Sequence, residues 1–356
     1  MKKLYFLFIS LCFTAVALAQ FTISGQVIDA ETKQPLEGAS VFAQNTTSGT
    51  ITNKEGHFKL SLNKGGYELM VTYTGYKNSQ KDIVAGTNET ITIELQKEDQ
   101  SMSEVVITSS NEVADGWQQY GGFFVQHFIG ATTFADSCTI LNPEALKFYF
   151  YKRSNKLKVL ATEPLQITNH ALGYNLRYTL DSFVHFYNTN INTYRGLCLY
   201  QPLEGTDEQQ QQWAQNRKTA YLGSRLHFLR AYYDSTLKEE GFTVDLLSAT
   251  DLRKFNRLLN PYDSTYYWVD DTTADVELFF PTKASITYNK QKPEKGYLQQ
   301  NKLPLDVGVQ ISYVDLLDAI LIKPNGFFTS QRNWINQGYW SWKNLADQLP
   351  YDYEPE

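Results

Sequence analysis

The sequence shows no excess of basic residues. It has 32 Lys and Arg against 38 Asp and Glu, so its formal net charge is −6. Loss of the two charges of Lys2 and Lys3 with a leader peptide would take this value to −8. Proteins that bind nucleic acid usually gather Lys and Arg into a patch or stripe. An acidic chain without such a stripe is therefore not expected to bind nucleic acid.

The sequence also lacks the spaced side chains of common catalytic and metal sites. No histidine is followed by the Glu or His that a zinc site of the HExxH kind requires. There is no glycine-rich phosphate loop and no GxSxG nucleophile elbow. Asp270, Asp271 and Asp275 follow no known Ca²⁺ loop and are interpreted as a solvated turn. We therefore expect no cofactor, no metal site and no locally encoded catalytic residue. The five histidines are His57, His127, His170, His185 and His227.

Cysteine is scarce. Cys12 lies in the first apolar run, which leaves Cys138 and Cys198 for the rest of the chain. In an oxidising compartment these two could form a disulfide, which would stabilise the fold by ~4 kcal/mol in the chain-entropy model. The alternative is two buried free thiols, and the sequence does not choose between them.

The sequence has only one long apolar run, from Leu4 to Leu18. It follows two lysines and ends in Ala17-Leu18-Ala19, which is typical of a secretory signal peptide cut after Ala19. The run is short for a membrane span. Leu11 before Cys12 is not the small residue of a lipoprotein signal. We predict that residues 1–19 direct export and that the mature chain has no transmembrane segment, with peripheral outer-membrane association at most.

From Phe21 onward, apolar residues recur at every second position. Phe21, Ile23 and Val27 alternate with polar residues, and the runs "HFKLSL", "YELMVTY" and "TITIEL" do the same. Such alternation predicts strands with one face in a core and one in water. Clusters of Asn, Gly and Lys separate the runs and indicate turns. Residues 20–97 are therefore predicted to form a small antiparallel β-sandwich.

The stretch "SGQVIDAETKQPLEGASVFAQNTTSGTITNKEGHFKLSL", with "YELMVTYTGY" after it, resembles the carboxypeptidase regulatory-like domain. Gly25, Pro35, Gly56, Phe58 and Gly75 are among the matching positions. The resemblance implies a transthyretin-like β-sandwich. It also implies an accessory module rather than a peptidase, so no catalytic residue is carried over.

A polar stretch at residues 98–115 is interpreted as a linker. Within it, Glu104–Thr108 (EVVIT) resembles the TonB box of TonB-dependent outer-membrane transporters, in which a similar segment follows the same kind of module. The alternative is a short strand that pairs with the sandwich or tethers the next domain.

Residues 116–356 mix helical and strand periods. "LGYNLRYTL" alternates from Leu172 to Leu180, and several other runs also predict strands. Residues 208–241 predict one long helix with Gly241 as its C-terminal cap. A shorter helix is predicted in "DGWQQYGGFFVQHFIG". The fold class is therefore mainly β, with a larger, mostly antiparallel α+β domain after the sandwich.

Arg217, Ser224 and His227 in the long predicted helix are candidate contacts for a ligand or partner. On one helix, Arg217 and Ser224 would share a face. A general base needs an orienting carboxylate, and no Asp or Glu lies one turn from His227. The pattern favours a helix packed on a sheet, with Arg217 donating hydrogen bonds to strand carbonyls, and leaves an active site as the alternative.

The segment "NGFFTSQRNWINQGYWSWKN" holds a second candidate contact. Its aromatic faces are of the kind that stack on sugars, with amides that bind hydroxyls. Trp340 and Trp342 are expected to share one face of a strand. The alternative is a C-terminal lid on the core. The residues singled out are Trp334, Tyr339, Trp340 and Trp342.

Together these features predict a non-catalytic, exported protein of the periplasm or outer-membrane surface of a Gram-negative cell. It is expected to bind an envelope protein or a glycan as an adaptor linked to outer-membrane uptake or surface assembly. One alternative is an envelope hydrolase whose residues meet only in the fold. Another is a purely structural envelope protein.

Overall fold

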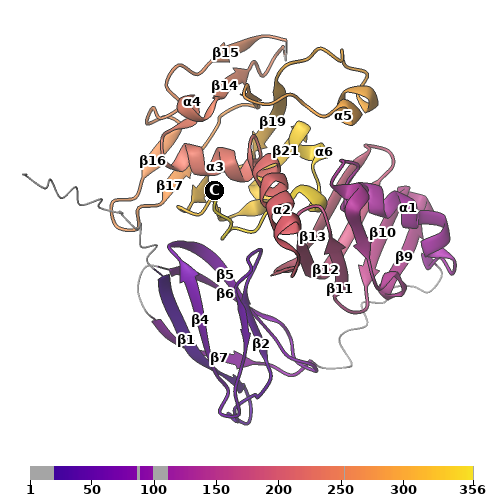
Figure 1. Ribbon diagram of the computed structural model, residues 1–356, viewed down its shortest axis with the longest axis vertical. Coiled ribbons are helices and arrows are strands. Elements are labelled where there is room, and N and C mark those ends of the chain that lie inside the picture. Colours follow the sequence, from indigo (N-terminus) through magenta and orange to yellow (C-terminus); the bar gives the residue numbers. More distant parts are fainter. Residues whose placement is uncertain (1–19, 86–88, 99–110, 252, 356) are drawn as a thin grey trace, which may run out of the picture.

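The computed structural model describes residues 20–85, 89–98, 111–251 and 253–355. Figure 1 shows a β-sandwich, formed by the first described residues, below a larger body of strands and helices. The end of the chain returns to the region between these two parts. The predicted signal peptide and the TonB-box-like segment Glu104–Thr108 lie outside the described residues.

The sandwich has the predicted alternation. Phe58, Leu60 and Leu62 of one strand are buried, while His57 and Lys59 are exposed. The two sheets have the strand orders β4-β1-β7 and β3-β2-β5-β6. The expectation of a purely antiparallel sandwich is wrong for one pair of strands, β1 and β7, which run parallel. Between them the chain forms β5 and β6 of the second sheet and then returns to the first sheet as β7. The strands are β1 Gln20–Asp29, β2 Ser40–Ala43, β3 Gly49–Ile51, β4 His57–Asn63, β5 Gly65–Thr72, β6 Ser79–Ala85 and β7 Glu89–Leu95.

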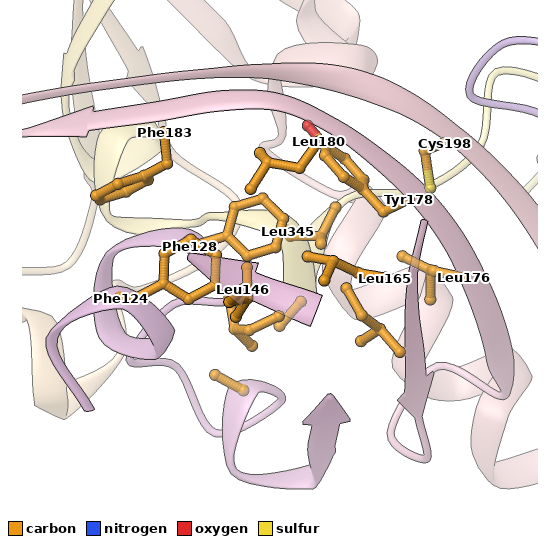
Figure 2. Packing of buried hydrophobic residues seen from close by; sticks show 14 of the residues in the cluster. Phe124, Phe128, Leu146, Leu165, Leu176, Tyr178, Leu180, Phe183, Cys198 and Leu345 are labelled. Carbon is orange, nitrogen blue, oxygen red and sulfur yellow. The ribbon is translucent and has the colours of Figure 1, made fainter. Parts of the chain in front are cut away.

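The first half of the body is a six-stranded sheet with a helix on one face. The strand order is β8-β11-β12-β10-β9, and β13 pairs with the long, alternating strand β12. Phe124 and Phe128 of α1 pack into the core with Phe183 of β12, and Figure 2 shows these rings close together. Both α1 and β12 were predicted from the sequence. The elements are α1 Gly116–Phe128, η2 Ala135–Ser137, β8 Cys138–Ile140, η3 Pro143–Ala145, β9 Leu146–Tyr151, η4 Lys152–Ser154, β10 Lys156–Ala161, β11 Leu165–Asn169, β12 Tyr174–Phe186 and β13 Ile191–Pro202.

The second half of the body has its own buried cluster. A five-stranded sheet of order β15-β14-β18-β19-β21 and a three-stranded sheet of order β16-β17-β20 enclose it, together with helix α3 Arg225–Tyr233. After β20 the chain turns, and a single bridge joins Ile322 to Phe328. The elements are β14 Phe242–Leu247, β15 Phe255–Arg257, β16 Tyr267–Val269, β17 Val276–Leu278, β18 Ala284–Tyr288, α5 Lys295–Gln300, β19 Gln310–Leu316, β20 Ile320–Ile322, η5 Gln331–Asn333, β21 Trp334–Gly338, α6 Tyr339–Trp342 and η6 Leu345–Asp347.

The single long helix predicted for residues 208–241 is wrong. Three helices replace it: α2 Asp207–Tyr221, α3 Arg225–Tyr233 and α4 Leu237–Glu240. Gly223 has a φ of 75°, which a helix does not accommodate, and Ser224 then begins a new helix. A second break follows at Ser235, with a φ of 57°. The predicted cap is confirmed, because Gly241 ends α4 in the left-handed conformation.

The sandwich is joined to the body at two places. Asn325 of the body forms hydrogen bonds with both backbone groups of Gly66 in β5. The loop after β2 lies along β13, where the Asn45 N–H donates to Cys198 O at 2.7 Å and the Tyr200 N–H donates to Thr46 O at 2.9 Å. We call these contacts the joint. They bury β5 on both faces near Gly66, which the alternating pattern of the sequence did not predict.

The disulfide considered for Cys138 and Cys198 is not formed, and both cysteines are free. Cys138 is in β8 and Cys198 is in β13, and β11 and β12 separate these strands. Three strand spacings amount to about 14 Å along a sheet. A disulfide requires Cα atoms within about 7 Å.

Candidate functional site

Ser224 is a helix cap. Its Oγ accepts a hydrogen bond from the His227 N–H at 3.1 Å, so it satisfies a backbone donor in the first turn of α3. Thr206 begins α2 in the same manner, with Gln209 completing a capping box. The seryl oxygen is thus engaged by its own helix, as a cap is, and not by a general base.

His227 is paired with a carboxylate that the sequence analysis did not identify. His227 Nε2 lies 3.0 Å from Glu240 Oε2. His227 Nδ1 accepts from the Gly223 N–H at 3.1 Å, so Nε2 carries the proton in the neutral ring and donates it to Glu240. Glu240 lies 13 residues further along the chain and reaches His227 only because the helix breaks and α4 folds back. The Gly241 cap was the one signal of that reversal.

Burial holds the His227–Glu240 pair in its neutral-imidazole form. Burial lowers the pKa of His227, while the hydrogen bond that His227 donates to Glu240 and the charge of Glu240 partly offset that effect. The His227 side chain is almost fully buried, whereas that of Glu240 is 44 % exposed. Two further buried polar atoms on neighbouring strands, Tyr288 Oη and Gln310 Oε1, have no hydrogen-bond partner. The imidazole has no face open to a substrate, although its carboxylate partner reaches water.

Arg217 packs on the sheet as expected, but it binds carbonyls of the turn before β12 and not the strand carbonyls that the sequence analysis expected. Its Nε donates to Leu172 O at 2.7 Å and its Nη2 to Gly173 O at 3.3 Å, and the guanidinium lies over the Tyr174 ring. Trp213, one turn earlier, donates to the His170 carbonyl, and Asn216, the preceding residue, donates to the Ala171 carbonyl. The polar face of α2 therefore satisfies four successive backbone carbonyls of a tight loop.

A small hollow beside Arg217 does not extend to Ser224 or His227. Its volume is about 220 Å³, and Gln211, Ala214, Gln215, Arg217, Lys218 and Tyr353 line it. Pockets for organic ligands typically have volumes of about 300–1,000 Å³. The structure does not bring the three candidate residues Arg217, Ser224 and His227 together around one cavity.

The aromatic segment near the C-terminus is part of the core. The side chains of Trp334, Tyr339, Trp340 and Trp342 are between 2 % and 8 % exposed. Residues 339–342 form α6, so the expected strand face shared by Trp340 and Trp342 is wrong. Trp340 Nε1 donates to Gly223 O at 2.7 Å, directly at the helix break. Of the two alternatives, this burial favours the lid, and Trp334 and Trp340 belong to the second core.

One buried carboxylate stands apart from the predicted residues. Asp347 accepts a hydrogen bond from the Thr132 hydroxyl at 2.7 Å through Oδ2, while Oδ1 has no partner. Burial raises the pKa of Asp347 to about 6. Among the described residues, no group of three or more His, Cys, Asp or Glu side chains is placed to hold a metal ion. Within the same residues, no helix is both long and apolar enough to cross a membrane.

Comparison with known families identifies the first module. Residues 23–107 match the family model described as CarboxypepD_reg-like domain. The TonB-dependent receptor SusC of Bacteroides thetaiotaomicron is 33 % identical over 94 residues, which cover 26 % of this chain and 9 % of the receptor. The TonB-dependent receptor P3 of Formosa agariphila is 25 % identical over 107 residues, which cover 30 % of this chain and 10 % of the receptor. The chain thus spans about a tenth of the length of these curated relatives.

Solved structures match over a similar share of the chain. Wild-type catechol 1,2-dioxygenase of Acinetobacter radioresistens aligns with a TM-score of 0.20 and 14 % identity, covering 24 % of this chain and 54 % of that one. A cohesin–X-dockerin complex of Acetivibrio cellulolyticus aligns with a TM-score of 0.21 and 17 % identity, covering 23 % of this chain and 61 % of that one.

Proposed function

We propose that this chain is an exported protein of a Gram-negative cell envelope that acts as an adaptor, by binding a protein partner. The observation that carries the proposal is the joint between the sandwich and the body. The joint attaches a module that is similar to part of TonB-dependent receptors to the body of the protein. The candidate catalytic residues of that body form hydrogen bonds that stabilise the fold.

The joint supports an adaptor because it fixes one module and leaves an edge of it open. Hydrogen bonds at Gly66 and at Asn45–Thr46 hold the sandwich at two points. Strand β6 pairs only with β5 among the described strands, and Val84 on it is 48 % exposed. An open edge strand can accept an extended segment of another chain through backbone hydrogen bonds. We propose this edge as the partner contact.

Site-specific crosslinking in cells tests the adaptor. A photo-reactive amino acid is placed at Val84, and a matched control carries it at Leu259, which is 93 % exposed on the body. We expect one discrete adduct with an envelope protein from position 84 and none from position 259. The same adducts from both positions, or none with an envelope protein from position 84, would contradict the proposal.

A hydrolase is the second candidate, and the His227–Glu240 pair favours it. Its weakness is that both imidazole nitrogens are engaged and the ring is buried. Chromogenic ester and glycoside substrates, offered to the wild type and to His227→Gln, decide between the two functions. We expect no turnover above background by either protein. Turnover that disappears in His227→Gln would establish the hydrolase instead.

A further inference from the structure

The face of the six-stranded sheet opposite α1 carries a row of aromatic, aliphatic and cationic side chains. Tyr151 pairs with Lys156 across β9 and β10, Lys156 with Phe186 across β10 and β12, and Phe186 with Ile191 across β12 and β13. Residues directly opposite one another on neighbouring strands project from the same face of a sheet. The next row on this face contains Tyr149, Lys158, Val184 and Thr193.

The helix α1 covers only the other face. The rows offset by one residue contain Phe150 and His185, and these rings meet α1. Tyr120 stacks on Phe150 at 6.1 Å between ring centroids, and Phe123 meets His185 at 4.7 Å. Phe186 and Ile191 on the opposite face are 38 % and 53 % exposed.

Cations concentrate on and beside this open face of an acidic protein. They come from β9, the η4 turn, β10 and β13, and between Lys147 and Lys158 the sequence contains no Asp or Glu. Two acids border the face: Glu112, which forms a bridge with Tyr149, and Asp181, which lies at the bulge of β12. The cationic residues are Lys147, Lys152, Arg153, Lys156, Lys158 and Arg195.

Two hairpin tips lie at the end of this face: residues 152–155 between β9 and β10, and residues 187–190 between β12 and β13. Hydrogen bonds link the two tips. The Tyr187 N–H donates to Asn155 O at 3.1 Å, and Asn155 Nδ2 donates to Asn188 Oδ1 at 2.9 Å. Lys156 Nζ lies 4.8 Å from the Tyr151 ring centroid and 6.0 Å from that of Phe186. The apolar and cationic groups are therefore held together before any partner binds.

We infer that this face, with its two hairpin tips, rests on an anionic lipid surface. Aromatic side chains with polar edges favour the headgroup level of a bilayer, and Lys and Arg extend their charges to anionic headgroups. Each Lys or Arg near such a surface strengthens binding by about fivefold. Phe186 and Ile191 provide exposed apolar groups for the interface, and the nearby cations match its negative charge. This inference goes beyond the adaptor function and stands without it.

Vesicle co-sedimentation of the full mature chain tests the inference. One set of vesicles contains phosphatidylglycerol mixed into phosphatidylcholine, and the other contains phosphatidylcholine alone. One variant reverses two exposed charges, Lys152→Glu with Arg153→Glu, and a second removes apolar contacts, Phe186→Ser with Ile191→Ser. The control is Trp268→Ser, whose side chain is 53 % exposed on β16, away from β9 and β10 and next to Asp270 and Asp271 (Figure 1).

We expect the wild type and Trp268→Ser to bind the anionic vesicles equally. Each double variant should bind them at least about tenfold more weakly. Added salt should weaken the binding of the wild type, since part of the attraction is between exposed charges. Thermal unfolding of each variant excludes misfolding as the cause of lost binding.

Several outcomes overturn the inference: no wild-type binding to anionic vesicles, equal binding to phosphatidylcholine alone, or unchanged binding after charge reversal. Polyglutamate provides the comparison with an acidic protein partner. The wild type could bind polyglutamate and neither kind of vesicle, and charge reversal could abolish that binding. This result would show that the face binds an acidic protein and not a lipid surface.

Discussion

Asn325 engages both hydrogen-bonding groups of Gly66 and so joins the two parts of the molecule. Asn325 Nδ2 donates to Gly66 O at 3.0 Å, and Asn325 Oδ1 accepts from the Gly66 N–H at 3.3 Å. A side-chain amide thereby satisfies backbone groups that would otherwise be buried without a partner. The close approach of Asn325 is possible because Gly65 has no side chain, and Gly66 leaves room in the same way for Lys323.

Gly66→Ala should weaken this joint. A Cβ at residue 66 would lie 2.4 Å from Cγ of Lys323, whose ammonium is held in a buried ion pair with Asp275. The expected solvated turn is therefore wrong for Asp275. We expect a loss of about 1–3 kcal/mol in the free energy of unfolding, measured by denaturant titration. The matched control is Gly122→Ala in α1, where nothing lies within 4 Å of the added Cβ. That control should gain up to about 1 kcal/mol from helix propensity. Equal effects of the two changes would contradict this account.

Ser224→Ala should destabilise the protein by about 1 kcal/mol, because it removes the cap of α3. Ser224→Asp should restore most of that loss, since a carboxylate caps a helix as well as a hydroxyl does. Thermal unfolding measures both changes. A nucleophilic serine would not be rescued by Asp, so failure of the rescue would argue against the capping role.

Asp347→Asn should make the protein more stable at neutral pH. The pKa of Asp347 is raised from 3.8 to about 6 by burial, so the folded state keeps a proton that the unfolded state has released. Stability from this group is therefore full below about pH 3.8 and is lost as the pH rises through 6. Two units of pKa correspond to about 3 kcal/mol at most. Denaturant titrations at pH 4 and pH 7.5 should show that the contribution of Asp347 to the free energy of unfolding falls between these pH values in the wild type. The variant should lack this fall.

His227 should act on stability in the opposite direction. Its pKa is lowered below 6.5, first by burial, so the unfolded state binds the proton more readily. Its contribution is present above pH 6.5 and is lost as the pH falls towards the folded value. His227→Gln should flatten this part of the acid limb of the stability curve. Replacement of the exposed His57 by Gln is the control, and identical curves for both variants would rule out the assignment.

The two thiols should be present but unreactive in the folded protein. Burial raises the pKa of Cys138 to about 12 and raises that of Cys198 as well. Since the thiolate is the reactive form, alkylation should be slow until the chain is unfolded. Mass spectrometry after denaturation without a reductant should then show two modified cysteines in the mature chain. A species two hydrogens lighter that resists alkylation would indicate a disulfide instead.

The sequence predicted elements whose pattern is local. Alternation in β4 and β12 and the helical period of α1 each specify one face for burial, and Gly241 ends a helix as expected. The break at Gly223 was not predicted, because an isolated glycine is tolerated inside many helices. Gly223 has a left-handed φ, packs closely against Tyr288 and accepts a hydrogen bond from Trp340 at its carbonyl. Tyr288 and Trp340 are distant from Gly223 in the sequence.

The sequence by itself determined the accessory module, the strand-rich class and the absence of local catalytic motifs, because each depends on residues within a few positions of one another. Only the tertiary structure decided what the candidate residues do. It paired His227 with Glu240, engaged Arg217 with backbone carbonyls and buried the Trp-rich segment. The role of a polar or aromatic side chain depends on which distant groups satisfy or cover it, and those groups become neighbours only when the chain folds.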